Sequence, residues 1–225
     1  MTEKIETNII TIDGPSGAGK STVARALAKR LNFAYLDTGA MYRALTLKAL
    51  KAGIDLADEQ QLIELADETT IEMITSERSG LKVLLDGDDV TEEIRTMEVT
   101  NNTFYIARAP KVRLLMVDWQ RKLGEKADVV IEGRDAGTVI FPKATYKFYL
   151  DADFAERCQR RCRELREKGE EVEEDKLAEE MKDRDHKDIS REAGPLKQAK
   201  DAILINSTSL SIEGVVDKLL EYISV

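Results

Sequence analysis

An eight-residue glycine-rich segment constrains the fold of this chain more than any other feature of its sequence. Residues 14–21 read GPSGAGKS and match the pattern G-x-x-x-x-G-K-[S/T] at every fixed position. The apolar run NIITID precedes the segment, and a stretch with apolar residues at helical spacing follows it. A strand, a glycine-rich loop and a helix in this order let backbone amides surround a phosphate group. The segment therefore predicts a nucleoside-triphosphate site.

Each residue type in this loop has a physical role. Glycines let the backbone wrap a phosphate without Cβ clashes, Lys20 adds a cation between the β- and γ-phosphates, and the Ser21 hydroxyl can ligate Mg²⁺. The loop alone does not choose between a kinase, a GTPase and a motor, although the N-K-x-D guanine reader of GTPases is absent from the sequence. We predict that ATP is contacted by Gly14, Pro15, Ser16, Gly17, Ala18, Gly19, Lys20, Ser21 and Thr22.

The rest of the chain alternates between strand and helix patterns, which is typical of an α/β fold with a parallel sheet. One stretch, residues 71–94, differs because it alternates in the manner of antiparallel strands, with predicted turns at Ser79-Gly80 and at residues 86–89. It predicts a small antiparallel insertion. A single helix is expected over residues 93–107, and a capping-box-like pair, Asp153 and Glu156, is expected to open a charged helix. The main strands are expected at residues 8–13, 33–37, 129–132, 147–150 and 202–205.

Composition excludes several other classes of protein. The 225 residues carry a net charge of −9, which argues against a general nucleic-acid binder, and no apolar run approaches the ~20 residues of a membrane helix. Two Cys and one His cannot form a Cys/His zinc site, and Cys158 and Cys162 are expected to be reduced thiols. We expect a cytoplasmic monomer without nucleic-acid or membrane partners.

Arginines gather at a few places in this acidic chain. In a parallel sheet, ligands bind at the carboxyl ends of the strands, so the glycine-rich loop, Asp37 and residues 132–135 should meet in one cleft. Several arginines at that cleft imply more phosphate than one triphosphate carries, and hence a second phosphorylated substrate. Arg160, Arg163 and Arg166 are expected instead to be solvated, and His186 is expected at the surface.

A phosphate acceptor simplifies the chemistry, because its oxygen is already an ionised nucleophile at neutral pH and needs no general base. The charged helices expected between residues 153 and 191 suit a lid that keeps water from the transferring group. Two alternatives stay open on chemistry alone. One is a kinase for a small-molecule hydroxyl, with Glu132 or Asp135 as base, and the other is a nucleotide-binding switch without catalysis.

Four segments together resemble bacterial cytidylate kinases, from about Ile9 to the C-terminus. They are GPSGAGKS, LDTGAMYR at 36–43, IEGRDAGTVIFP at 131–142 and DRDHKDISREAGPL at 183–196. The resemblance implies a P-loop kinase with a central parallel sheet flanked by helices, a small antiparallel insertion in the monophosphate-binding domain, and a helical lid. It implies phosphoryl transfer from MgATP to CMP or dCMP, giving ADP and CDP or dCDP.

The resemblance also implies a division of the chain into three regions. The core would comprise residues 1–37, 108–152 and 197–225, the CMP-binding region residues 38–107, and the lid residues 153–196. The catalytic residues it implies are Lys20, Arg134, Arg157 and Arg161. At the metal site it implies Ser21, together with Glu132, which would contact the metal through water. The CMP-binding residues it implies are Thr38, Tyr42, Arg43, Arg113, Arg134, Asp135, Arg184, Asp188 and Arg191.

The cytosine readers implied by the resemblance, Arg113 and Asp135, make chemical sense. A carboxylate accepts from the cytosine N4 amino group, and a guanidinium donates to N3 and O2, whereas the uracil carbonyl at position 4 would repel a carboxylate. Two positions depart from the family pattern. Phe104 stands where a base-reading Ser is frequent, with Thr103 beside it, and Ala136 stands where a larger aliphatic residue is usual.

Overall fold

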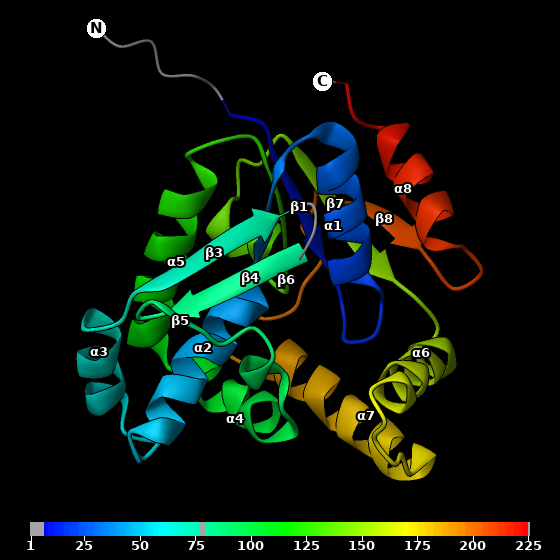
Figure 1. The fold of residues 1–225 in the computed structure, drawn as a ribbon. Helices are drawn as coiled ribbons and strands as arrows, with labels where there is room; N and C mark the ends of the chain where they lie inside the picture. The colour runs from blue at the N-terminus through cyan, green and yellow to red at the C-terminus, as the bar shows by residue number, and fades with distance from the viewer. Residues whose placement is uncertain (1–6, 77–79, 225) are drawn as a thin grey trace, which may run out of the picture.

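A five-stranded parallel sheet forms the centre of the protein, as the alternating sequence pattern predicts. The computed structural model describes residues 7–76 and 80–224 and places the strands in the order β2-β6-β1-β7-β8 (Figure 1). All four strand pairs are parallel. The strands are β1 (Ile9–Asp13), β2 (Ala34–Asp37), β6 (Val129–Gly133), β7 (Tyr146–Asp151) and β8 (Ile203–Asn206).

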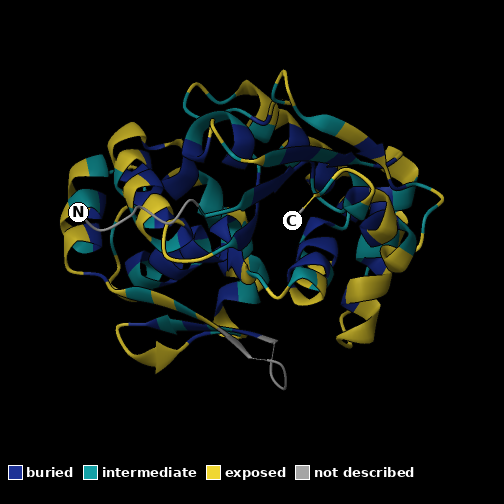
Figure 2. Cartoon of the chain, turned by 90° about the horizontal axis from the view of Figure 1, so that it is seen from above, coloured by how far each residue is buried: buried dark blue, intermediate teal, exposed yellow. Residues whose placement is uncertain are grey.

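Helices cover both faces of this sheet. On one face, α1 (Lys20–Leu31) and α8 (Ile212–Leu220) pack against Ile10, Ile12 and their neighbours. On the other face lie α2 (Thr38–Lys51), α3 (Glu59–Asp67) and α5 (Pro110–Gly124), which share a second apolar cluster. Figure 2 shows buried residues along the sheet and on the helix sides facing it, with exposed residues outside. The sheet is therefore held rigidly from both sides, and its strand ends are fixed relative to one another.

The small antiparallel insertion is also present. It consists of β3 (Ile71–Ser76), β4 (Gly80–Leu85) and β5 (Asp88–Asp89), and its apolar side joins the cluster that holds α1. Asp86 and Gly87 turn the chain with φ of 52° and 93°. Ser79 lies outside the described residues, and Gly80 is already the first residue of β4.

The segment between the insertion and α5 differs from its prediction. Residues 93–107 do not form one helix: a 3₁₀ turn, Glu93–Arg95, ends before α4 (Met97–Arg108) begins. Thr96 separates them because its backbone is extended and its hydroxyl accepts from the Val99 amide at 3.4 Å, so the chain restarts a helix at an N-cap.

Two further helices lie at the carboxyl edge of the sheet, and Figure 1 shows them on the side away from both chain ends. They are α6 (Phe154–Glu167) and α7 (Glu174–Ser190), which pack together through Cys162, Leu165, Leu177 and Met181. The expected capping box is wrong: the Asp153 side chain caps nothing, its amide donates to the Thr208 hydroxyl, and Glu156 pairs with Arg160. The ranges assigned to core, CMP-binding region and lid stay predictions.

Candidate active site

The glycine-rich loop runs from the end of β1 to the start of α1, and its glycines have conformations that other residues rarely adopt. Gly17 and Gly19 have φ of 76° and 91°. A Cβ on Gly17 would also lie 2.9 Å from the Arg157 carbonyl oxygen, so the backbones of the loop and α6 are in close approach. The Lys20 ammonium folds over the loop and donates to the Pro15 carbonyl at 2.7 Å.

Lys20 is a buried cation, 6% exposed. Burial, together with the positive charge of Arg134, lowers the pKa of Lys20 from 10.5 to about 7. Glu132 only partly counteracts this effect. An anion placed beside Lys20 would supply the missing counter-charge, which is what a triphosphate offers.

Ser21 and Glu132 meet beside this lysine. The Ser21 hydroxyl donates to Glu132 Oε1 at 2.5 Å, and burial, with the nearby charge of Asp37, raises the pKa of Glu132. Among the described residues no cluster of three or more His, Cys, Asp or Glu side chains can hold a metal ion. One hydroxyl and one carboxylate instead fit Mg²⁺ that is bound mainly by nucleotide phosphates and water.

The start of α2 presents polar groups to the same cleft. The Thr38 hydroxyl donates to the Glu132 carbonyl at 2.8 Å, and Arg43 pairs with Asp37 at 3.1 Å. Within the described part of the chain, the Tyr42 hydroxyl and Arg43 Nε are buried without hydrogen-bond partners. Unsatisfied buried polar atoms are costly, so these two atoms mark a place where a polar ligand would fit.

A buried charge cluster lies just past the end of β6. Arg113 from α5 donates directly to Asp135 Oδ2, and Arg191 reaches Oδ1 of the same carboxylate at 3.7 Å. Burial raises the pKa of Asp135, and the two arginines partly offset that effect. The Arg113 guanidinium also stacks 5.6 Å from the centre of the Tyr42 ring. The sequence places these residues far apart, and the fold joins them.

Several charged side chains meet between the end of β6 and α7. Arg134 donates to Asp188 at 2.8 Å, and Arg191 lies 3.8 Å from the same carboxylate. Burial and the charge of Arg134 lower the pKa of Arg184 to about 10, and Arg43 and Arg161 act in the same direction. Arginines from α2, α6, α7 and the segment after β6 thus approach one another, which favours an anionic ligand between them.

The two arginines predicted as lid residues have different partners. Arg157 donates to the Ser16 carbonyl at 2.9 Å and to Asp185 at 2.5 Å, so it already contacts the glycine-rich loop. Asp185 in turn accepts from the Ser16 amide at 3.2 Å. Arg161 pairs with Glu164 of the same helix at 2.7 Å, and its positive charge contributes to the lowered pKa of Arg184.

Some residues of this region were not anticipated. Arg160 is not a solvated surface residue: its guanidinium donates to the Ser207 carbonyl at 2.7 Å and ties α6 to the chain after β8. Asp185 accepts from the Ser16 amide and Asp37 accepts from the Ala40 amide, and the motifs that contain these two residues do not reveal either contact. Arg163 and Arg166 are exposed as expected, and so is His186.

The two departures from the family pattern have structural outcomes. Phe104 lies with its ring 5.6 Å from Lys187 Nζ of α7 and 5.6 Å from the Arg108 guanidinium. The Thr103 hydroxyl donates to the Val99 carbonyl at 2.7 Å, so it is used inside α4. Ala136 is fully buried in the cluster that includes Ile140, which makes it a packing position.

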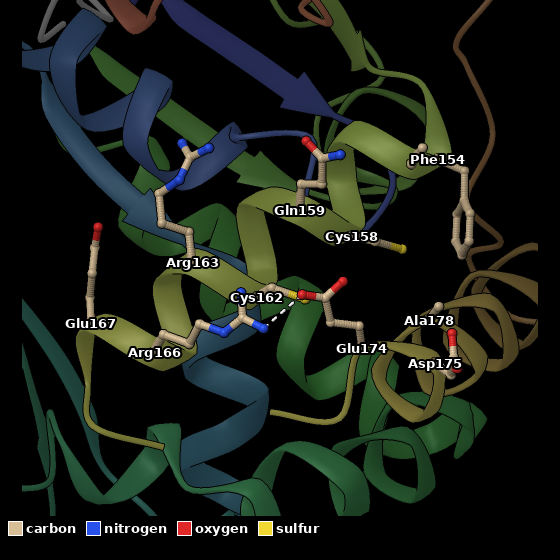
Figure 3. Close-up of a pocket in the computed structure, with 11 residues that line it drawn as sticks. Phe154, Cys158, Gln159, Cys162, Arg163, Arg166, Glu167, Glu174, Asp175 and Ala178 are labelled. Carbon is tan, nitrogen blue, oxygen red and sulfur yellow. Dashed lines mark hydrogen bonds and ion pairs between the residues drawn. The ribbon is translucent and has the colours of Figure 1, made fainter. Parts of the chain in front are cut away.

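A cleft of about 740 Å³ lies between α6 and α7 (Figure 3). Phe154, Cys158 and Cys162 line it from α6, and Arg166 pairs across it with Glu174 at 2.7 Å. Both thiols are free, as expected, and burial raises the pKa of Cys158, which makes that thiol a weak nucleophile.

The parallel sheet, the phosphate loop at its carboxyl edge and the cationic site facing that loop define a P-loop kinase. The sequence profile of the family "Cytidylate kinase" matches residues 10–225. A cytidylate kinase of Desulforamulus reducens is 48% identical over 218 residues, covering 97% of each chain. A cytidylate kinase of Bacillus subtilis is 49% identical over 212 residues, covering 94% of each chain. The chain belongs to the cytidylate kinase family.

The similarity of this chain to solved structures supports the fold and no further property. A shikimate kinase from Bacteroides thetaiotaomicron superposes with a TM-score of 0.50 at 16% identity, covering 96% of this chain and 97% of that one. An uncharacterised protein from Eubacterium ventriosum gives a TM-score of 0.54 at 17% identity, covering 96% and 98%. No helix among the described residues is both long and apolar enough to cross a membrane.

Proposed function

We propose that this enzyme transfers a phosphoryl group from ATP to CMP or dCMP and releases ADP and CDP or dCDP. One observation carries the proposal: the buried Arg113–Asp135 pair lies beside a set of arginines that also approaches Lys20. This arrangement supports a site in which a base reader and two phosphate-binding groups would share one cleft. The family membership supports the same activity.

The donor nucleotide would bind through the amides of residues 14–22 and the Lys20 ammonium. Ser21 would ligate Mg²⁺ directly, and Glu132 would reach it through water, which is consistent with their 2.5 Å contact. The metal would neutralise charge on the β- and γ-phosphates. Arg157 of α6 already donates to the Ser16 carbonyl of this loop, and its guanidinium would donate to phosphate oxygens when the donor is bound.

The acceptor would bind in the opposite half of the cleft. Arg43, Arg134 and Arg191 would hold its phosphate, with Thr38 and Tyr42 beside them, and the unpartnered Tyr42 hydroxyl and Arg43 Nε would gain partners. Arg184 and Asp188 would contact the ribose. The acceptor phosphate oxygen attacks the γ-phosphorus in line, the bond to the ADP oxygen breaks, and Lys20, Arg134, Arg157 and Arg161 stabilise the charge on the transferring group.

Base selection would follow from the hydrogen-bonding groups of Asp135, an acceptor, and Arg113, a donor. Asp135 would accept from the cytosine N4 amino group, and Arg113 would donate to N3 and O2. Uracil would place a carbonyl oxygen against the carboxylate, so that two acceptors face each other in a buried site, which is unfavourable. The ribose contacts proposed for Arg184 and Asp188 would tolerate a 2′-deoxy sugar, so both CMP and dCMP are proposed as acceptors, with a monomeric enzyme.

A coupled ADP-release assay across acceptors tests this proposal. We expect CMP and dCMP to stimulate ADP formation strongly, and UMP, AMP and shikimate to do so at least 100-fold less efficiently in kcat/KM. Equal rates with all monophosphates would contradict the base-reading role of Asp135 and Arg113. Transfer to shikimate with none to CMP would instead indicate a kinase for a hydroxyl acceptor.

A further inference from the structure

Asp13, the last residue of β1, carries a buried carboxylate that no step of the proposed reaction uses. Its side chain accepts two backbone hydrogen bonds, from the Ala136 amide to Oδ1 and from the Gly137 amide to Oδ2, both at 2.8 Å. The residue is 4% exposed. Both oxygens are therefore occupied by two consecutive amides of a segment 123 residues further along the chain.

The backbone of Asp13 is fixed on both sides. In the sheet it pairs with Gly133 of β6 and with Tyr149 of β7. The next residue, Gly14, opens the glycine-rich loop with a φ of 151°, and a Cβ on it would collide with the Leu150 carbonyl oxygen. Asp13 is thus an anchored point from which the donor loop departs.

The segment that Asp13 holds lies past the end of the sheet, where side-chain pairs and the turn that follows take over from strand pairing. β6 ends at Gly133, so Arg134 and Asp135 have no strand partner, and Asp135 has an irregular backbone at φ −143° and ψ 22°. Ala136 and Gly137 begin a π-helical turn, Ala136–Ile140. The two amides bound by Asp13 come directly after the acceptor residues, where they fix the direction of the chain.

The electrostatics agree with a carboxylate at this point. Burial raises the pKa of Asp13 from 3.8 to about 6, while the Gly137 and Ala136 amides and the charge of Lys20 act against that rise. The group is therefore ionised at neutral pH and accepts through both oxygens. A neutral amide in its place would offer one acceptor and turn a donor toward an N–H group.

We propose that Asp13 is a positioning residue that holds the Arg134–Asp135 segment against the origin of the donor loop and so sets the register between acceptor base, acceptor phosphate and donor. This role rests on the proposed function for its kinetic consequence. The carboxylate acts through Asp135 and Arg134 rather than on a nucleotide. Its loss should therefore affect CMP more than ATP, and base selectivity more than turnover with a saturating acceptor.

The test compares Asp13→Asn with Thr11→Val. Thr11 lies two residues earlier, on the same side of β1, and its buried hydroxyl has no partner among the described residues. We expect Asp13→Asn to raise the KM for CMP at least tenfold and to lower the CMP-to-UMP ratio of kcat/KM at least tenfold, with the KM for ATP within threefold. Thr11→Val should match the wild type. An unchanged ratio, or equal increases for ATP and CMP, would overturn the role.

Amide hydrogen exchange tests the structural part of the proposal, that Asp13 holds this segment in place, and it needs no activity measurement. In the wild type, the Ala136 and Gly137 amides should exchange as slowly as those of β6, and in Asp13→Asn at least 100-fold faster, with Thr11→Val unchanged. Fast exchange at both amides in the wild type overturns the proposal even if no Asp13 variant folds. A wild type without CMP preference would contradict the proposed function, while the exchange result would still decide whether Asp13 holds this segment.

Discussion

Lys20 is the residue whose removal should affect chemistry most and structure least. Its ammonium makes one hydrogen bond, to the Pro15 carbonyl, and the cost of burying it lowers its pKa to about 7. We expect Lys20→Met to keep the fold and to reduce kcat at least 1,000-fold, because the lost charge acts mainly on the transition state. Steady-state kinetics with calorimetric CMP binding checks this: kcat within tenfold of the wild type would refute it.

Asp135 should control which base is accepted. Asp135→Asn keeps the volume of the side chain but removes the charge that repels the uracil carbonyl. We expect the CMP-to-UMP ratio of kcat/KM to fall at least tenfold, mostly through loss of CMP activity, since Arg113 then faces a neutral partner. The ratio is measured in one protein, so a general loss of stability cancels. Parallel losses for both bases would mean that another group reads the ring.

Asp13 also predicts a pH dependence of stability. Its folded pKa, about 6, lies above its ordinary 3.8, so between these values the folded chain holds a proton that the unfolded chain releases. Stability from this group is therefore fully present below about pH 4 and is lost as pH rises through 6, by ~3 kcal/mol in total. Urea unfolding of the wild type and Asp13→Asn from pH 4.5 to 7.5 measures it. A stability difference that does not change with pH would contradict the assignment.

At the scale of elements, the contact between the glycine-rich loop and α6 can be isolated with two glycines. Gly17 and Gly169 have similar φ, 76° and 81°, but only Gly17 faces atoms of α6 and α7, whereas Gly169 has open space. Gly169→Ala should cost about 1 kcal/mol of stability and leave kinetics unchanged. Gly17→Ala should in addition raise the KM for ATP at least tenfold, because the loop must shift. Identical kinetics in both variants would exclude a functional approach of α6.

At the scale of the whole molecule, two ligands should bind one folded unit from opposite sides of its cleft. In Lys20→Met, which holds both nucleotides without turnover, CMP at 100 times its dissociation constant should stabilise by about 2.7 kcal/mol. That corresponds to a rise in Tm of roughly 5–10 °C for a chain of this size. Differential scanning calorimetry with CMP, UMP and MgATP measures it. A rise with UMP equal to that with CMP would contradict the acceptor assignment.

Local patterns sufficed for the sheet and for the conformation of the glycine-rich loop. Residues 14–21 lie next to one another in the chain, so one motif between a strand and a helix predicts a phosphate loop and its geometry confirms that form. The helix expected over residues 93–107 was wrong because one threonine, Thr96, stops a periodic pattern that continues on both sides. The helix α3 had no prediction, since it is short and lies outside every motif.

The sequence by itself determined the class of fold, the donor loop and the identities of the charged residues, because strand periodicity and a contiguous motif are local properties. Only the tertiary structure decided which charges meet: Arg113 with Asp135, Arg134 with Asp188, and Asp13 with the Ala136 and Gly137 amides. Arg160 and Asp185 show the same limit, since their partners are backbone atoms of distant loops. Such pairings depend on how rigid strands and helices pack, and no local pattern encodes the distance between two separate strand ends.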